Sequence, residues 1–236
     1  MKTKLILPVL LFFLAAGVAF GAPTEAGSPE SDTNVLLWPT MDYTNFLAGH
    51  PDEAKRAEMW RYFLEVEREA KGFAGTRNHW KPIHTATLGK GIPIYVTSGR
   101  IRMNTNSGAA IFHEIFHDTF HGSRFNQGED KAWAEAFCDA FRYMMEKKYL
   151  PEPRSSWFLK LDRFSDETYT QVMARSGDKH FDQKYLYPAS LIVHKADRNL
   201  EKFRALWFEL QDLRKTNNAD VLNNYFGYDM KNGKPL

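Results

Sequence analysis

Apolar residues recur every three or four positions along several stretches of this chain, which is the spacing that places them on one face of a helix. The pattern is strongest around Trp133, Phe137 and Phe141. Lysines follow that stretch and Pro151 lies just beyond it, as is usual at the end of a helix. We therefore predict helices over residues 51–71, 108–121, 129–148, 165–175, 188–196 and 199–215.

One stretch has a different pattern. Residues 92–103 are rich in β-branched and aromatic side chains and contain the turn-forming pair Ser98 and Gly99, so we predict a strand or a hairpin. Pro93 favours an edge position in the sheet, because proline cannot donate a hydrogen bond to a neighbouring strand. No regular element is predicted for residues 72–90 or 217–236, and a loop or extended segment is predicted for residues 180–187. Together these patterns predict a predominantly helical α+β fold with a small sheet.

The first 21 residues have the pattern of a secretory signal peptide. Lys2 and Lys4 precede an apolar run, and Ala19 and Gly21 fit the rule for cleavage before Ala22. The apolar run has about 16 residues and contains a proline, which is short for a membrane span. We therefore expect a secreted or periplasmic protein without stable membrane insertion after cleavage.

After this segment, the composition of residues 22–34 predicts a flexible leader. Residues 35–236 are expected to form a single domain. Its N-terminal part runs to about residue 122, and a helical part begins at about residue 123. Without Lys2 and Lys4 the chain has equal numbers of basic and acidic residues, so charge gives no reason to expect a nucleic acid as a partner. Cys138 is the only cysteine, so no internal disulfide forms, and we expect a buried, inert thiol. We expect a monomer.

The strongest candidate for a functional site is the H-E-x-x-H pattern formed by His113, Glu114 and His117. The two histidines are four residues apart, so a helix brings both imidazoles to one face, about 6 Å apart along its axis. Two imidazoles at this spacing can share one Zn²⁺ ion, and Glu114 lies at the edge of that face, within reach of a metal-bound water. A separate stripe of phenylalanines gives the same helix an apolar face. The pattern therefore predicts a metal site.

A catalytic zinc ion usually has three protein ligands and one open position. His121 continues the same helix face, but it lies about 12 Å along the axis from His113, which is too far for one ion. Glu135 is the stronger candidate, because a glutamate flanked by apolar residues needs a positive partner. Asp139 follows four residues later and could accept a hydrogen bond from a ligating histidine. We expect His79, His84 and His194 to be surface or loop residues and not metal ligands.

An H-E-x-x-H helix followed by a helix with E-x-x-x-D resembles the pattern of gluzincin metallopeptidases, the thermolysin-like branch of the zincins. The segment AWAEAF, residues 132–137, is similar to the third-ligand helix of the lethal-factor-like members. The resemblance covers residues 111–143. It implies a minimal zincin-like domain that hydrolyses peptides or proteins with Zn²⁺ as its cofactor.

The resemblance also implies a mechanism. Zn²⁺ held by His113, His117 and Glu135 would polarise the scissile carbonyl and acidify a bound water. Glu114 would take the proton of that water and pass it to the leaving amine. We therefore expect Glu114 to be the general base.

Two further features of gluzincins have candidates in this chain. The strand expected over residues 92–103 stands where an edge strand pairs with extended substrate. A tyrosine or histidine from the C-terminal part stabilises the oxyanion, and we favour Tyr187 over the alternatives Tyr185 and His180. The alternative function is a non-catalytic or toxin-like binding protein on a zincin scaffold.

Overall fold

The computed structural model describes residues 53–74, 85–88, 94–97, 100–103, 109–120, 130–150, 154–213 and 219–236. Within these ranges the chain forms a predominantly helical α+β fold, as the sequence predicts, but with two small sheets instead of one. None of the helices in these ranges is both long enough and apolar enough to cross a bilayer. Several predictions lie outside the described residues: the signal peptide, the leader, Pro93, the turn at Ser98 and Gly99, and the histidines His79, His84 and His121.

Each helix predicted from apolar periodicity is present, with its ends shifted by a few residues. The H-E-x-x-H helix is shorter than expected, because its last turn narrows to a 3₁₀ turn. These elements are α3 (Glu53–Ala74), α4 (Ala110–Phe116), η1 (His117–Phe120), α5 (Asp130–Tyr149), α7 (Tyr169–Arg175), α9 (Tyr187–Lys195) and α10 (Leu200–Leu213).

The prediction of a loop or extended segment over residues 180–187 is wrong, because this segment is helical. The carboxylate of Asp182 is fully buried there and accepts a hydrogen bond of 2.6 Å from Lys160, so a tertiary contact stabilises the turn. Other short elements also lie where periodicity predicts none. The additional elements are α6 (Ser156–Phe164), α8 (Lys179–Phe181), the π-helical turn η3 (Asp182–Leu186), α11 (Ala219–Phe226), β4 (Tyr228–Asp229) and β5 (Lys234–Pro235).

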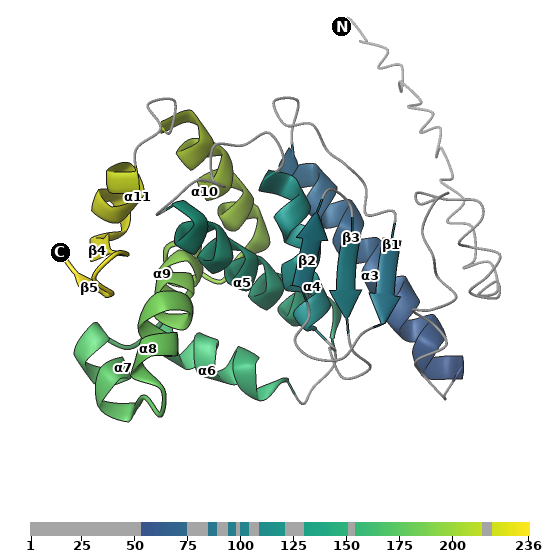
Figure 1. Ribbon diagram of the computed structural model, residues 1–236, viewed down its shortest axis with the longest axis horizontal. Coiled ribbons are helices and arrows are strands. Elements are labelled where there is room, and N and C mark those ends of the chain that lie inside the picture. Colours follow the sequence, from purple (N-terminus) through teal and green to yellow (C-terminus); the bar gives the residue numbers. More distant parts are fainter. Residues whose placement is uncertain are drawn as a thin grey trace, which may run out of the picture.

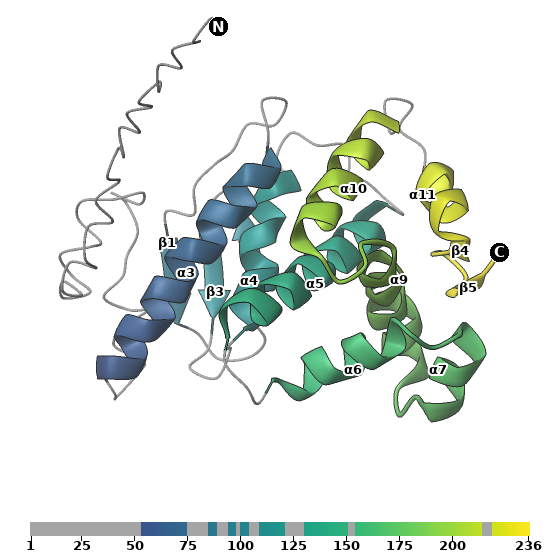
Figure 2. The same ribbon diagram turned by 180° about the vertical axis from the view of Figure 1, so that it is seen from behind.

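The predicted hairpin is confirmed, since β2 (Ile94–Thr97) and β3 (Arg100–Met103) pair antiparallel. A third strand, β1 (Thr85–Leu88), pairs parallel with β3 in a stretch for which no element is predicted. The order is β1-β3-β2, so β2 is an edge strand among the described strands. The sheet lies on one side of the molecule (Figure 1), and the view from behind shows α3 and α4 covering one of its faces (Figure 2).

An aromatic cluster holds α4 against α3, α5 and α10. The ring of Phe116 stacks on that of Phe141, with centroids 4.3 Å apart, and meets Phe73 edge to face at 5.3 Å. Trp207 packs on Phe116 at 5.2 Å and donates a hydrogen bond to the carbonyl oxygen of Phe73. All four side chains are fully buried. Because this contact fixes the apolar side of α4, the polar side of the helix is also held in a defined direction.

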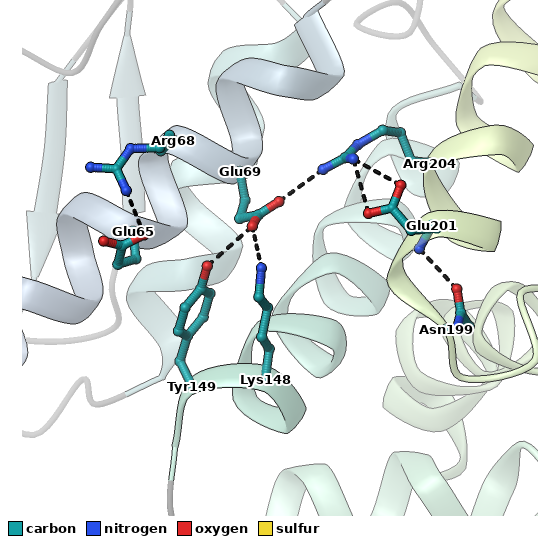
Figure 3. A network of polar contacts seen from close by, with 8 residues as sticks. All are labelled: Glu65, Arg68, Glu69, Lys148, Tyr149, Asn199, Glu201 and Arg204. Carbon is teal, nitrogen blue, oxygen red and sulfur yellow. Dashed lines mark hydrogen bonds and ion pairs between the residues drawn. The ribbon is translucent and has the colours of Figure 1, made fainter. Parts of the chain in front are cut away.

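A polar network joins α3, α5 and α10 (Figure 3). Glu69 accepts hydrogen bonds from Lys148 and from the hydroxyl of Tyr149, the latter at 3.1 Å. Its other oxygen pairs with Arg204 at 2.8 Å, and Arg204 also pairs with Glu201 at 2.9 Å. Burial disfavours the charge on Glu69, but the neighbouring cations outweigh it and hold the pKa of Glu69 below its usual value. Three helices thus meet at one carboxylate.

Candidate metal centre

Two histidines lie side by side where α4 passes into η1. His113 is near the middle of α4, and His117 opens the 3₁₀ turn four residues later. Their Nε2 atoms are 3.1 Å apart, and their side chains are 15% and 14% exposed. The neighbouring Phe112 and Phe116 are buried. The helix therefore has a polar side that solvent reaches and an apolar side packed in the core.

Glu135 on α5 completes a triangle of donor atoms. Its Oε2 lies 3.1 Å from Nε2 of His113 and 3.5 Å from Nε2 of His117. A tetrahedral ion with metal–ligand bonds of about 2.0–2.1 Å holds its ligand atoms about 3.3–3.5 Å apart. The edges of the triangle are close to this spacing, and Zn²⁺ commonly binds imidazole and carboxylate ligands. The three residues therefore fit one metal ion of this size.

Asp139 supports the triangle from the other side of His113. Its Oδ1 lies 2.9 Å from Nδ1 of His113 and can accept the hydrogen of that nitrogen. When Nδ1 carries the hydrogen of a neutral imidazole, Nε2 has a free lone pair and can bind a metal. Glu135 and Asp139 are four residues apart on α5, so both lie on the face turned to α4.

The carboxylates around the histidines make this place favourable for positive charge. Burial disfavours a charged imidazole at His113, but Asp139, Glu135 and Glu114 outweigh it and raise the pKa of His113 to about 10. Burial also disfavours the charge on Glu135, and the two histidines outweigh that effect and hold its pKa far below the usual range. A bound divalent cation would be stabilised by the same carboxylates that stabilise a proton here.

Two further ionisable groups lie next to the triangle. Glu114 is 7% exposed, and its charge contributes to the raised pKa of His113. The predicted burial of Cys138 is confirmed, since no part of it is exposed, and its inertness stays a prediction. Burial and the nearby carboxylates, among them those of Glu135 and Asp139, raise the pKa of this thiol well above its usual value.

The position of Cys138 beside the histidines is a feature that sequence reasoning missed. Its Sγ and one ring nitrogen from each of His113 and His117 all lie within 4.8 Å of one another. Helical spacing could have shown it, because Cys138 follows Glu135 by three residues and so lies on the same face of α5.

The favoured oxyanion donor lies in a separate aromatic cluster. Tyr187 opens α9, and its ring packs against those of Tyr169 at 5.3 Å and Tyr228 at 5.4 Å. Burial raises its pKa above the usual value. The alternatives Tyr185 and His180 are exposed on η3 and α8. The polar contacts that form the triangle include none of these three side chains, so a catalytic role for each of them stays a prediction.

Comparison with known proteins identifies no relative of this chain. No protein-family model matches it, and no curated protein and no solved structure matches it. The side chains of the centre and their geometry are therefore the basis on which a function is assigned.

Proposed function

We propose that the protein is an exported, zinc-dependent metallopeptidase with a zincin-like domain. One observation carries the proposal: Nε2 of His113, Nε2 of His117 and Oε2 of Glu135 form a triangle with edges of 3.1, 3.1 and 3.5 Å. Three protein ligands leave a fourth position open for water or substrate, which is the arrangement of catalytic rather than structural zinc sites. The contact of Asp139 with His113 supports the same assignment, because ligating histidines commonly have a carboxylate partner.

The residues around the triangle are suited to hydrolysis. Zinc in this place would supply a Lewis acid that polarises a carbonyl and lowers the pKa of a water. Glu114 directly follows His113 in α4 and is mostly buried, so its carboxylate is screened little by bulk water. We assign to Glu114 the transfer of a proton from the attacking water to the leaving amine.

The edge strand β2 supports an extended peptide as the substrate. It lies at one side of the three-stranded sheet and contacts α4, the helix that carries both histidines. An edge strand keeps one row of backbone N–H and C=O groups that its own sheet leaves for another chain. Tyr187 remains the proposed oxyanion donor, since α9 packs along α5, the helix that carries Glu135.

Cys138 favours a second candidate, a zinc protein without catalysis. If the thiolate joined His113, His117 and Glu135, four protein ligands would close the coordination shell, as in structural zinc sites. Such a protein would bind its target on a zincin-like scaffold. A structural site has no use for a general base, so the presence of Glu114 beside the ligands favours the enzyme.

Peptide hydrolysis by the zinc-loaded protein tests the proposal. Glu114→Gln keeps the size of the side chain and removes its ability to accept a proton. This variant should still bind one zinc ion and should lose at least about 100-fold in turnover. The matched control is Glu201→Gln, since Glu201 is 73% exposed on α10, and it should retain full activity.

The readouts are the zinc content of each protein and the cleavage of a mixed peptide library with and without a chelator. Full turnover by Glu114→Gln, or by the protein stripped of metal, would refute the proposed function. Stoichiometric zinc without any cleavage by the unmodified protein would favour the non-catalytic candidate.

A further inference from the structure

The only thiol of the chain lies at the proposed metal centre. Glu135, Cys138 and Asp139 occupy positions i, i+3 and i+4 of α5, so all three side chains lie on the face turned to α4. The two carboxylates of this set already contact His113. Cys138 is fully buried. A buried thiol among metal-binding side chains calls for a chemical explanation beyond packing.

The two histidines and Cys138 form a second set of three donors. Sγ and a ring nitrogen from each histidine lie within 4.8 Å of one another. A tetrahedral ion of the size of Zn²⁺, with a metal–sulfur bond of about 2.3 Å and metal–nitrogen bonds of about 2.1 Å, holds sulfur and nitrogen about 3.6 Å apart. A movement of about 1 Å in these side chains therefore brings the sulfur into a coordination shell that the histidines share.

We infer that His113 and His117 serve two alternative ligand sets, one with Glu135 for zinc and one with Cys138 for soft cations such as Cd²⁺. A carboxylate is a hard oxygen donor, whereas a thiolate is a soft donor that selects thiophilic ions. This inference rests on the metal centre of the proposed function and not on its catalytic activity. A soft cation held in this way excludes zinc from the two histidines.

The exchange of ligands is a simple substitution. When Cd²⁺ binds to the metal-free centre, the S–H bond of Cys138 would break, the proton would pass to solvent, and the thiolate would take the coordination position that Glu135 would occupy on zinc. No electron is transferred. The negative carboxylates of Glu114 and Asp139 lie close by and favour a divalent cation with either ligand set.

Titration of Cd²⁺ into the metal-free protein tests the inference. The readout is the ultraviolet charge-transfer absorption of a thiolate bound to cadmium. Because the chain has one cysteine, such a band reports on Cys138 alone. The band should saturate at one ion per chain and should be lost in Cys138→Ser. That variant should also shift the selectivity for Cd²⁺ over Zn²⁺ by at least about tenfold toward Zn²⁺.

Two further variants keep the test decisive. Cys138→Ala replaces the thiol with an apolar group if serine is not tolerated in the core, and it should lose the band as well. His113→Ala retains the thiol and should weaken Cd²⁺ binding at least about tenfold, because a thiol alone is a poor site. Binding of Cd²⁺ without the band, no binding of Cd²⁺, or an unchanged titration of His113→Ala would each overturn the inference.

Failure of the inference and failure of the proposed function have different outcomes. A cadmium band without any peptide cleavage by the zinc-loaded protein would support the two ligand sets and refute the peptidase. Cleavage with zinc and no cadmium band would support the peptidase and overturn the two ligand sets.

Discussion

The proposed centre depends most on His113, because both nitrogens of its ring have partners. Nδ1 contacts Asp139 at 2.9 Å, and Nε2 contacts Glu135 and His117, each at 3.1 Å. These contacts fix the orientation of the ring before any metal binds. A ligand held in its binding geometry loses less conformational entropy when the ion arrives, which favours tight binding.

Asp139→Asn tests the support that His113 receives. The substitution keeps the shape of the side chain and removes its charge, so the new amide no longer favours the tautomer of His113 with its hydrogen on Nδ1. Zinc affinity should fall about 10–100-fold, measured by competition with a chromophoric chelator.

A matched control for this variant is Asp178→Asn, on the exposed end of α8. Asp178 accepts a hydrogen bond of 3.0 Å from the backbone N–H of Phe181, and asparagine caps a helix about as well as aspartate. The control should bind zinc normally. Equal zinc affinity in both variants and the unmodified protein would remove Asp139 from the centre.

Residue pairs that helical spacing defines can be predicted from the sequence. His113 and His117 share a face, as do Glu135 and Asp139, and local spacing is sufficient to show this. The predicted exposure of His194 on α9 is also confirmed. The surroundings of Tyr187 could not be predicted, because its neighbours come from α7 and β4.

Among the helices, α4 depends strongly for its stability on contacts with neighbouring helices. Its seven residues are far fewer than an isolated helix needs in water, and Ala109 at its N-cap makes no side-chain hydrogen bond. The contacts of Phe116 with Phe73, Phe141 and Trp207 therefore supply much of the stability that keeps both histidines in place.

Phe116→Ala should reveal this dependence. Removing a fully buried phenylalanine leaves a cavity, so the free energy of unfolding of the metal-free protein should fall by about 3–5 kcal/mol. Phe208→Ala on α10 is the control, because its ring is 38% exposed, and it should cost less than about 1.5 kcal/mol. Urea denaturation measures both values. Equal losses would contradict the role given to Phe116.

Apolar periodicity predicts the long helices and not the short ones between them. The turn η3 is held by contacts across the chain: Asp182 bonds Lys160, and Gln183 donates to the hydroxyl of Tyr169. No local pattern contains such information. The start of α6 does have a local signal, since the hydroxyl of Ser155 caps it by accepting a bond from the backbone of Phe158.

At the scale of the whole molecule, the proposed centre joins α4 to α5, and the network of Glu69 joins α5 to α3 and α10 (Figure 3). The long helix α5 therefore takes part in both of these polar sites. The fold class and the hairpin follow from local patterns in the sequence. The parallel pairing of β1 with β3 does not, because a contact between distant segments leaves no periodic pattern in either one.

Glu69→Gln should destabilise the molecule in a pH-dependent way. The pKa of Glu69 in the folded protein is below its value of about 4.5 in the unfolded chain. Its ionic stabilisation is therefore fully present above about pH 4.5 and is lost as the pH falls through the folded pKa. At pH 7 the variant should lose about 1–3 kcal/mol of unfolding free energy, and this difference should shrink in acid.

The control for this variant is Glu65→Gln on the same helix. Glu65 pairs only with Arg68 in Figure 3, at 2.6 Å, and Arg68 is 61% exposed. Exposed pairs of this kind contribute less than about 1 kcal/mol. Thermal denaturation of the three proteins between pH 3 and pH 7 measures the effect. If the loss of unfolding free energy in Glu69→Gln did not change with pH, the loss could not be assigned to the charge of Glu69.

X-ray absorption at the zinc edge of the zinc-loaded protein tests the central claim most directly, because it identifies the atoms bound to the ion. We predict two imidazole nitrogens from His113 and His117, with the remaining neighbours oxygen from Glu135 and water. All of these should lie at about 2.0–2.2 Å. A zinc–sulfur distance of about 2.3 Å, or a shell without imidazole, would contradict the proposed ligand set.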